Sequence, residues 1–202
     1  MILTLDKYQS GRYKLPHSVA APNESDNTED ITMFIDRYER ELLVDALGVD
    51  LYNDIKDNKA DFNAAPDEVK RLVKGYDYTL DDGTKVSWNG LDNSESLLIP
   101  YVYYRYLQDQ QDIMTTFGVE RPQGVNSEAV SSIPRVTAAY RDFFEKYQSV
   151  DNGVAFYSSP YISGIDYLGS KNIRRSLYQF LCDNDYDISH FKLFENTNQF
   201  GV

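Results

Sequence analysis

Apolar and aromatic side chains are densest between Leu97 and Leu107, where Pro100 and Arg105 are the only exceptions. Drawn as a helix, this stretch is apolar on every side, so other parts of the protein must cover it on every side. It is too short to cross a lipid bilayer. Because the pattern becomes amphipathic after Leu107, we predict a helix over 92–117 that lies in the middle of a bundle, or between the core and a partner subunit.

The predicted ends of this central helix carry local signals. Asp92 can cap the start, with Glu95 three residues later as in a capping box, and Gly118 follows Phe117 as a C-terminal glycine. Pro100 lies between these limits and has no backbone N–H to donate. It therefore predicts either a kink or a new first turn at that point.

Five other segments show the 3.6-residue period of a helix. They are 27–47, 49–56, 65–73, 126–148 and 170–181, with Gly48 separating the first two. Ahead of the central helix, two β-prone runs flank Asp81-Asp82-Gly83, which predicts a hairpin at about 76–88. A lone hairpin is only marginally stable in water, so it must pack on the bundle or pair with another chain.

Together these elements predict a mainly α fold: a helical bundle with one β-hairpin, an extended N-terminal arm and an aromatic-rich C-terminal extension. The arm is 1–29 and begins with a strand-like apolar run at 2–5, the bundle is 30–149, and the extension is 150–202. The extension holds too many aromatic side chains to remain in water. We therefore expect it to dock on the bundle or on a neighbouring subunit.

Aromatic side chains are favoured at protein interfaces. The chain has 17 tyrosines and 10 phenylalanines among its 202 residues, so it is well supplied with them. The candidates for a subunit interface come from the central helix and from the C-terminal extension: Tyr101, Tyr104, Phe156, Tyr157, Tyr161, Phe191 and Phe194.

The chain carries 32 acidic and 20 basic residues, which is a formal net charge of −12. Such a protein does not suit binding to nucleic acid through the phosphates, because that needs clustered basic side chains. Asp50, Asp54 and Asp57, followed by Asp61, form an acidic stripe if the segment stays helical. A solvated face is the simplest interpretation, and a cation site or a surface that repels DNA are the functional alternatives.

Few residues offer catalytic or metal-binding chemistry. Cys182 is the only cysteine, and His17 and His190 are the only histidines, so an internal disulfide is excluded and a zinc site is not expected. We predict that Cys182 is buried and structural rather than a nucleophile paired with His190. The sequence contains no glycine-rich phosphate loop, nucleophile elbow or HExxH motif, and we predict neither enzymatic activity nor a cofactor.

Lys171, Arg174 and Arg175 form the only compact basic cluster in the sequence. This cluster could contact phosphate, an acidic neighbour, or only solvent on a helix face. In so acidic a chain, the acidic neighbour is the favoured partner. No stretch suits a membrane helix or a signal peptide, so we expect synthesis in the cytoplasm.

Three stretches carry a resemblance to a known family. They are FIDRYERELLVDALGVDLYNDI, WNGLDNSESLLIPYVYYRYLQDQ and TTFGVERPQGVNSEAVSS, and with the helix that follows them they span about 34–147. In order and texture, the chain resembles the small head–tail connector proteins of tailed bacteriophages, also called neck or adaptor proteins. The resemblance is greatest to those of crAss-like and other phages of Bacteroidetes.

The resemblance implies a helical subunit repeated in a twelvefold ring between portal and tail. The implied partners are other copies of the chain, the portal, and other neck or tail proteins. DNA would pass through without specific binding, and no membrane, cofactor or enzymatic activity is involved. The implied location is the virion, after synthesis in the host cytoplasm. An acidic face at Asp50, Asp54 and Asp57 would let DNA pass along the bore, because like charges prevent phosphate binding.

Two other classes of function stay open. An acidic, soluble interaction module that mimics DNA would bind a basic protein and remain a monomer or dimer. A carboxylate-dependent hydrolase would need a deep pocket that holds two acids with displaced pKa values.

Overall fold

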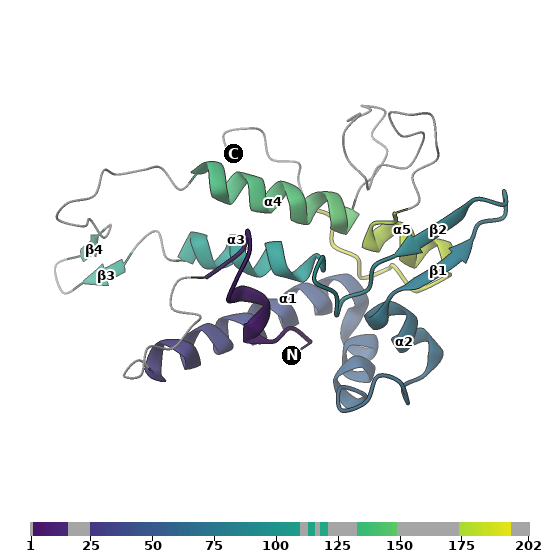
Figure 1. Cartoon of the computed structure of the whole chain (residues 1–202), viewed down its shortest axis with the longest axis horizontal. Helices are drawn as coiled ribbons and strands as arrows, with labels where there is room; N and C mark the ends of the chain where they lie inside the picture. The colour runs from purple at the N-terminus through teal and green to yellow at the C-terminus, as the bar shows by residue number, and fades with distance from the viewer. Residues whose placement is uncertain are drawn as a thin grey trace.

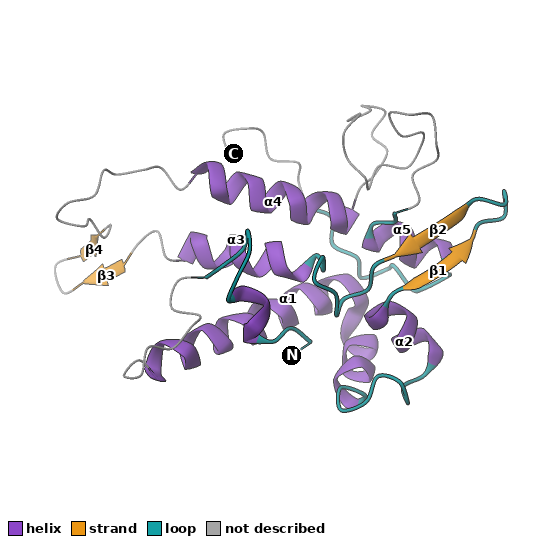
Figure 2. Cartoon of the chain, viewed as in Figure 1, coloured by secondary structure: helices purple, strands orange, loops and turns teal. Residues whose placement is uncertain are grey.

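A computed structural model describes residues 2–15, 25–109, 113–115, 118–120, 133–148 and 174–194. Within these ranges most residues are helical, and a hairpin lies where the Asp-Asp-Gly turn predicted one. The prediction of a mainly helical fold with a β-hairpin is therefore confirmed. Three helices, α1, α3 and α4, form the frame, with α3 lying between the other two (Figures 1 and 2).

Helix α1 spans Ser25–Asp57 and is broken at Gly48, whose φ of 78° and ψ of 170° are not helical. The ribbon of α1 changes direction partway along (Figure 1). This backbone region is essentially restricted to glycine, because a Cβ atom would clash with the chain itself. The two predicted helices on either side of Gly48 are therefore both present, as two parts of α1.

Helix α2 spans Asp67–Lys74, and its ends lie within two residues of the predicted helix at 65–73. Pro66 is the N-cap residue, immediately before the first turn. Strands β1, Tyr76–Thr79, and β2, Lys85–Trp88, then pair antiparallel with Tyr76 opposite Trp88. Helix and hairpin touch where Gly75 meets Gly90. A Cβ atom on Gly90 would lie 2.5 Å from the Gly75 nitrogen, so no larger residue fits.

The hairpin packs on its own chain. The buried indole of Trp88 donates to the Leu72 carbonyl at 2.9 Å and stacks on Phe180 with the ring centroids 5.3 Å apart. The backbone N–H of Arg175 donates to the Ser87 carbonyl at 2.9 Å, which places the C-terminal segment along β2. Of the two ways expected to stabilise the hairpin, packing on the bundle is the one observed.

Helix α3 spans Leu98–Asp109, so the expected start at Asp92 is wrong. The side chain of Asn93 accepts the Glu95 N–H at 3.0 Å, and this local turn replaces the expected capping box. The Ser96 hydroxyl instead accepts the Leu98 N–H at 3.2 Å. Pro100 falls in the first turn, where its missing N–H leaves no helical bond unmade.

The expected end of the central helix at Phe117 is also wrong. After α3, strands β3, Ile113–Thr115, and β4, Gly118–Glu120, form a second antiparallel pair that was not predicted. Ile113, Thr115 and Thr116 have branched Cβ atoms, which favour strand over helix. This local preference outweighs the weak amphipathic pattern that suggested a longer helix.

The last two helices, α4 and α5, lie in the C-terminal half of the chain. Helix α4 spans Ile133–Gln148 with Pro134 in its first turn, and the expected helical start at 126 lies outside the described residues. Helix α5 spans Leu177–Asp183 and begins with a capping box between Ser176 and Gln179. Residues 174–176 are not helical, so this part of the prediction for 170–181 is wrong.

The N-terminal arm is tied to the bundle. Instead of the expected strand at 2–5, a 3₁₀-helix, η1, spans Leu5–Tyr8. The N–H groups of Ile2 and Leu3 donate to the Glu39 carboxylate of α1, so they are not available to pair with a strand. Side chains of Leu3, Tyr8 and Leu15 are fully buried.

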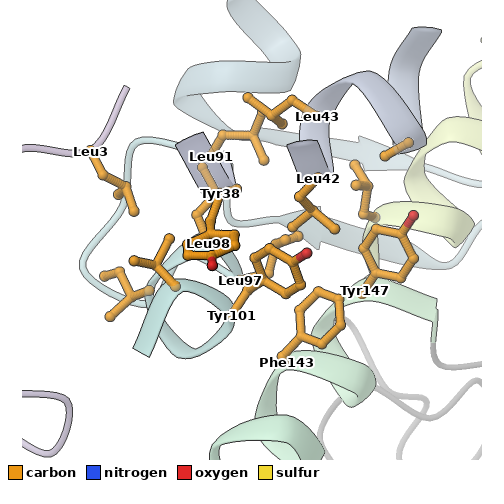
Figure 3. Close-up of a cluster of buried hydrophobic side chains, with 14 of the residues drawn as sticks. Leu3, Tyr38, Leu42, Leu43, Leu91, Leu97, Leu98, Tyr101, Phe143 and Tyr147 are labelled. Carbon is orange, nitrogen blue, oxygen red and sulfur yellow. The ribbon is translucent and has the colours of Figure 1, made fainter. Parts of the chain in front are cut away.

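The core lies around α3. Figure 3 shows Leu98 and Tyr101 of this helix packed among side chains from α1, α4 and the N-terminal arm. The buried set that meets here includes Leu3, Tyr38, Leu42, Leu43, Leu91, Leu97, Phe143 and Tyr147. The expectation that the most apolar stretch forms the middle helix is confirmed.

Candidate functional site

Four of the aromatic side chains predicted to form a subunit interface meet in one cluster within the chain. Tyr101 of α3 lies 4.8 Å from Phe143 of α4, measured between ring centroids. Phe194 lies 5.1 Å from Phe143, and Phe191 stacks on Tyr147 at 4.6 Å. Tyr104 lies 5.0 Å from Tyr140. The other three candidates, Phe156, Tyr157 and Tyr161, lie outside the described residues.

Polar contacts hold the C-terminal segment on this aromatic cluster. The Gln148 side chain bonds the Phe194 backbone twice, donating to its carbonyl at 2.7 Å and accepting its N–H at 2.6 Å. The Tyr147 hydroxyl donates to the Lys192 carbonyl at 2.9 Å, and the Lys192 ammonium pairs with Asp45 at 2.9 Å. The described part of the extension therefore docks on α1 and α4 of its own chain.

Because of these contacts, the four described aromatic candidates expose little surface to a partner subunit. Tyr101 is only 1% exposed, and burial raises the pKa of its hydroxyl, with the nearby Glu41 carboxylate adding to the effect. Tyr104, Phe191 and Phe194 are half-buried and each keeps an outer edge. A role for those edges in a subunit interface stays a prediction.

The acidic stripe lies on the second part of α1. Asp50, Asp54 and Asp57 are exposed on this helical segment, whereas Asp61 follows the helix and accepts the Asn63 N–H at 2.9 Å. We call the first three residues the acidic face. No group of three metal-ligating side chains occurs among the residues that the structure describes, so the alternative of a cation site gains no support.

A hollow of about 570 Å³ lies between the N-terminal arm, α3 and the start of α4. Three exposed cationic side chains line it: Arg12, Lys14 and Arg135. The remaining lining comes from Gly11, Tyr13, Tyr103, Pro134, Ala138 and Ala139. We call this feature the basic hollow. Sequence inspection missed it because Arg135 is far along the chain from Arg12 and Lys14, and no local motif joins them.

Within the described part of the chain, the Asp142 carboxylate lies beside the basic hollow and is already engaged. Asp142 accepts the Tyr13 hydroxyl at 2.5 Å and pairs with the Lys146 ammonium at 3.2 Å. Burial raises the pKa of Tyr13 well above its ordinary range, and the bond to Asp142 adds to the rise. Tyr13 therefore remains a neutral hydrogen-bond donor that ties the arm to α4.

The basic cluster predicted from the sequence is paired within the chain. Arg174 lies 3.3 Å from Glu95, and Arg175 lies 2.9 Å from Asp183. Lys171 lies outside the described residues. Both arginines thus contact acidic neighbours, as favoured, and the neighbours belong to the same protein.

Cys182 is exposed, so its predicted burial is wrong. The inward face of α5 is formed by Leu177, Phe180 and Leu181, which leaves the thiol on the outside. His190 lies against Gly48 of α1, and His17 is outside the described residues. No described contact joins the Cys182 thiol to the His190 ring.

Glu39 is a buried carboxylate that sequence inspection missed. It is 2% exposed, and its oxygens accept the N–H groups of Ile2 and Leu3 at 2.5 and 2.8 Å. Burial raises the pKa of Glu39, while these two bonds lower it by a smaller amount. Glu39 holds the N-terminal arm on α1. In the sequence it is one polar residue among others on this helix, which gives no sign of the contact.

Comparisons with protein families, with curated proteins and with solved structures find no match. Among the described helices, none combines the length and the apolar character needed to cross a membrane.

Proposed function

We propose that this chain is a structural subunit of a head–tail connector ring in a tailed bacteriophage, joining portal to tail and letting DNA pass. The stretches that resemble connector proteins correspond to most of the frame. FIDRYERELLVDALGVDLYNDI lies within α1, and WNGLDNSESLLIPYVYYRYLQDQ runs from β2 through α3.

The observation that carries this proposal is the presence of two separate surfaces of opposite charge. The acidic face lies on the second part of α1, whereas the basic hollow lies between the arm, α3 and α4. A ring needs two different surfaces that fit each other, because each subunit contacts its neighbours head to tail. A twofold dimer would instead use one surface that fits itself.

The net charge of −12 suits a passage for DNA. DNA is not held by a wall that lacks clustered cations, because phosphate binding depends on Lys and Arg. In the proposed setting the partners are twelve or a similar number of copies of this chain, the portal, and other neck or tail proteins. The protein would reside in the virion after synthesis in the host cytoplasm.

The proposal is tested by locating the chain in particles. A peptide tag on the chain, labelled with gold and viewed by electron microscopy of purified virions, should mark a single position between head and tail. Virions without the chain, or label spread over the head or the tail fibres, would contradict the proposal.

The exposed acidic face also favours a second candidate, an acidic interaction module that mimics DNA. Such a module would bind a basic DNA-binding protein and compete with DNA for it, and it would be missing from virions. For the hydrolase alternative, the hollow is lined by three cations and offers no pair of carboxylates among the described residues.

A further inference from the structure

Three positive side chains converge on the basic hollow of a strongly negative protein. Arg12 and Lys14 come from the N-terminal arm, and Arg135 comes from the first turn of α4. Bringing like charges together is unfavourable unless an anion balances them. The nearby Asp142 carries a single negative charge, and its Oδ2 already pairs with the Lys146 ammonium and accepts the Tyr13 hydroxyl.

Three exposed cations elsewhere in the chain find carboxylates within it. Lys74 lies 3.1 Å from Asp92, Arg174 lies 3.3 Å from Glu95, and Lys192 lies 2.9 Å from Asp45. The three cations of the basic hollow form no ion pair with any other residue that the structure describes, as is also true of Lys56 and Lys59, but these three line one hollow. Their charge is available to an acidic partner.

A second copy of the chain offers an acidic partner. From Asp50 to Asp57 the helix rises about 10 Å, so the three carboxylates lie within two turns of α1. All three carboxylates of the acidic face are exposed. Three negative groups on one side therefore match three positive groups on the other.

Apolar contacts accompany the charges. Val49, next to the acidic face, is 58% exposed. The hollow contributes Tyr103, Ala138 and Ala139 as apolar lining. Tyr103 and Ala139 are already only 6% and 1% exposed, so most of the apolar surface that docking removes from water would come from Val49.

We propose that the acidic face of one copy docks in the basic hollow of the next copy, so that subunits join head to tail. This inference rests on the proposed ring and names the contact that closes it. It places Asp50, Asp54 and Asp57 between subunits, which replaces their expected position along the bore.

A charge-exchange experiment tests the contact. The first variant carries Arg12→Glu, Lys14→Glu and Arg135→Glu, and the second carries Asp50→Lys, Asp54→Lys and Asp57→Lys. Each variant alone presents like charges to itself and should fail to form the ring. An equimolar mixture should restore the ring, because each variant then offers the surface that the other lacks. Native mass spectrometry reads the assembly, and circular dichroism checks that both variants fold.

A matched control reverses three exposed acids elsewhere, Asp67→Lys, Asp77→Lys and Asp81→Lys. The control changes the net charge as much as the second variant does, and it should leave the ring intact. Rings formed by either reversed variant alone, or no rings in the mixture, would overturn the proposed contact and leave the ring proposal standing. If the second variant assembles but blocks DNA passage, the face lines the bore and the contact is wrong. A wild-type chain that never assembles, with or without the portal, would overturn the ring itself.

Discussion

At the scale of single residues, Glu39 makes the stability of the fold depend on pH. Burial raises the pKa of Glu39 in the folded protein above the ordinary value of 4.5. Just above pH 4.5, the folded protein therefore keeps a proton on Glu39, whereas the unfolded chain has lost it. The contribution of this group to stability is therefore full below pH 4.5 and falls as pH rises through the folded-state pKa.

Glu39→Gln removes this titration and keeps the size of the side chain. We expect the free energy of unfolding of the wild type, minus that of the variant, to increase as pH falls from 7 towards 5. Urea unfolding at several pH values measures the difference, and the other carboxylates cancel because both proteins share them. A difference that stays constant or decreases towards pH 5 would show that the pKa of Glu39 is not raised.

Gly48 sets the break between the two parts of α1. Gly48→Ala should destabilise the protein by roughly 2 kcal/mol, because alanine is strained in this backbone region. The new Cβ atom would also lie 2.8 Å from Cδ2 of His190, but that ring is exposed and can shift. Most of the loss should therefore persist in a His190→Ala background, as measured by urea unfolding.

Gly11→Ala is a useful control for the Gly48 variant. Gly11 also has a positive φ, of 84°, but a Cβ atom there meets nothing within 4 Å. Gly11 is an exposed residue that follows η1, and it does not separate two helical segments. A Gly48→Ala variant as stable as the wild type would mean that α1 runs through without a break.

At the scale of elements, substitutions of Ser96 and Asp92 distinguish the observed start of α3 from the expected one. The Ser96 side chain is 1% exposed and accepts the Leu98 N–H, so Ser96→Ala should lower the free energy of unfolding by about 1 kcal/mol. Asp92→Ala removes only a partly exposed ion pair with Lys74 and should cost less than about 0.5 kcal/mol. Thermal or urea unfolding of both variants gives the order, and the reverse order would place the helix start at Asp92.

Elements with a single strong signal could be predicted from the sequence. Gly48, Pro66 and the Asp81-Asp82-Gly83 turn each restrict the backbone on their own, so the two parts of α1, the helix α2 and the hairpin lie where expected. The predictions were wrong where tertiary contacts or competing local turns decide the structure. Glu39 accepts the N–H groups of Ile2 and Leu3, which would otherwise pair in a strand, and Asn93 forms a turn in place of the expected cap.

At the scale of the whole molecule, the acidic face was predictable and the basic hollow was not. Helical period alone places Asp50, Asp54 and Asp57 together, and all three are exposed among the residues that the structure describes. The basic hollow exists only because the arm folds back beside α4, which joins Arg12 and Lys14 to Arg135. The aromatic candidates also show what composition cannot predict. Composition suggested a subunit interface, whereas Tyr101 and Phe194 contact each other within the chain.

The mass of the purified chain in solution tests the ring most directly. Light scattering or native mass spectrometry should be run over a range of concentrations, on the chain alone and with the portal protein of the same phage. Twelve chains of 23.3 kDa come to about 280 kDa, and a closed assembly near that mass, alone or on the portal, is the predicted result. A chain that stays near 23.3 kDa at every concentration, including beside the portal, would contradict the connector and favour the acidic interaction module.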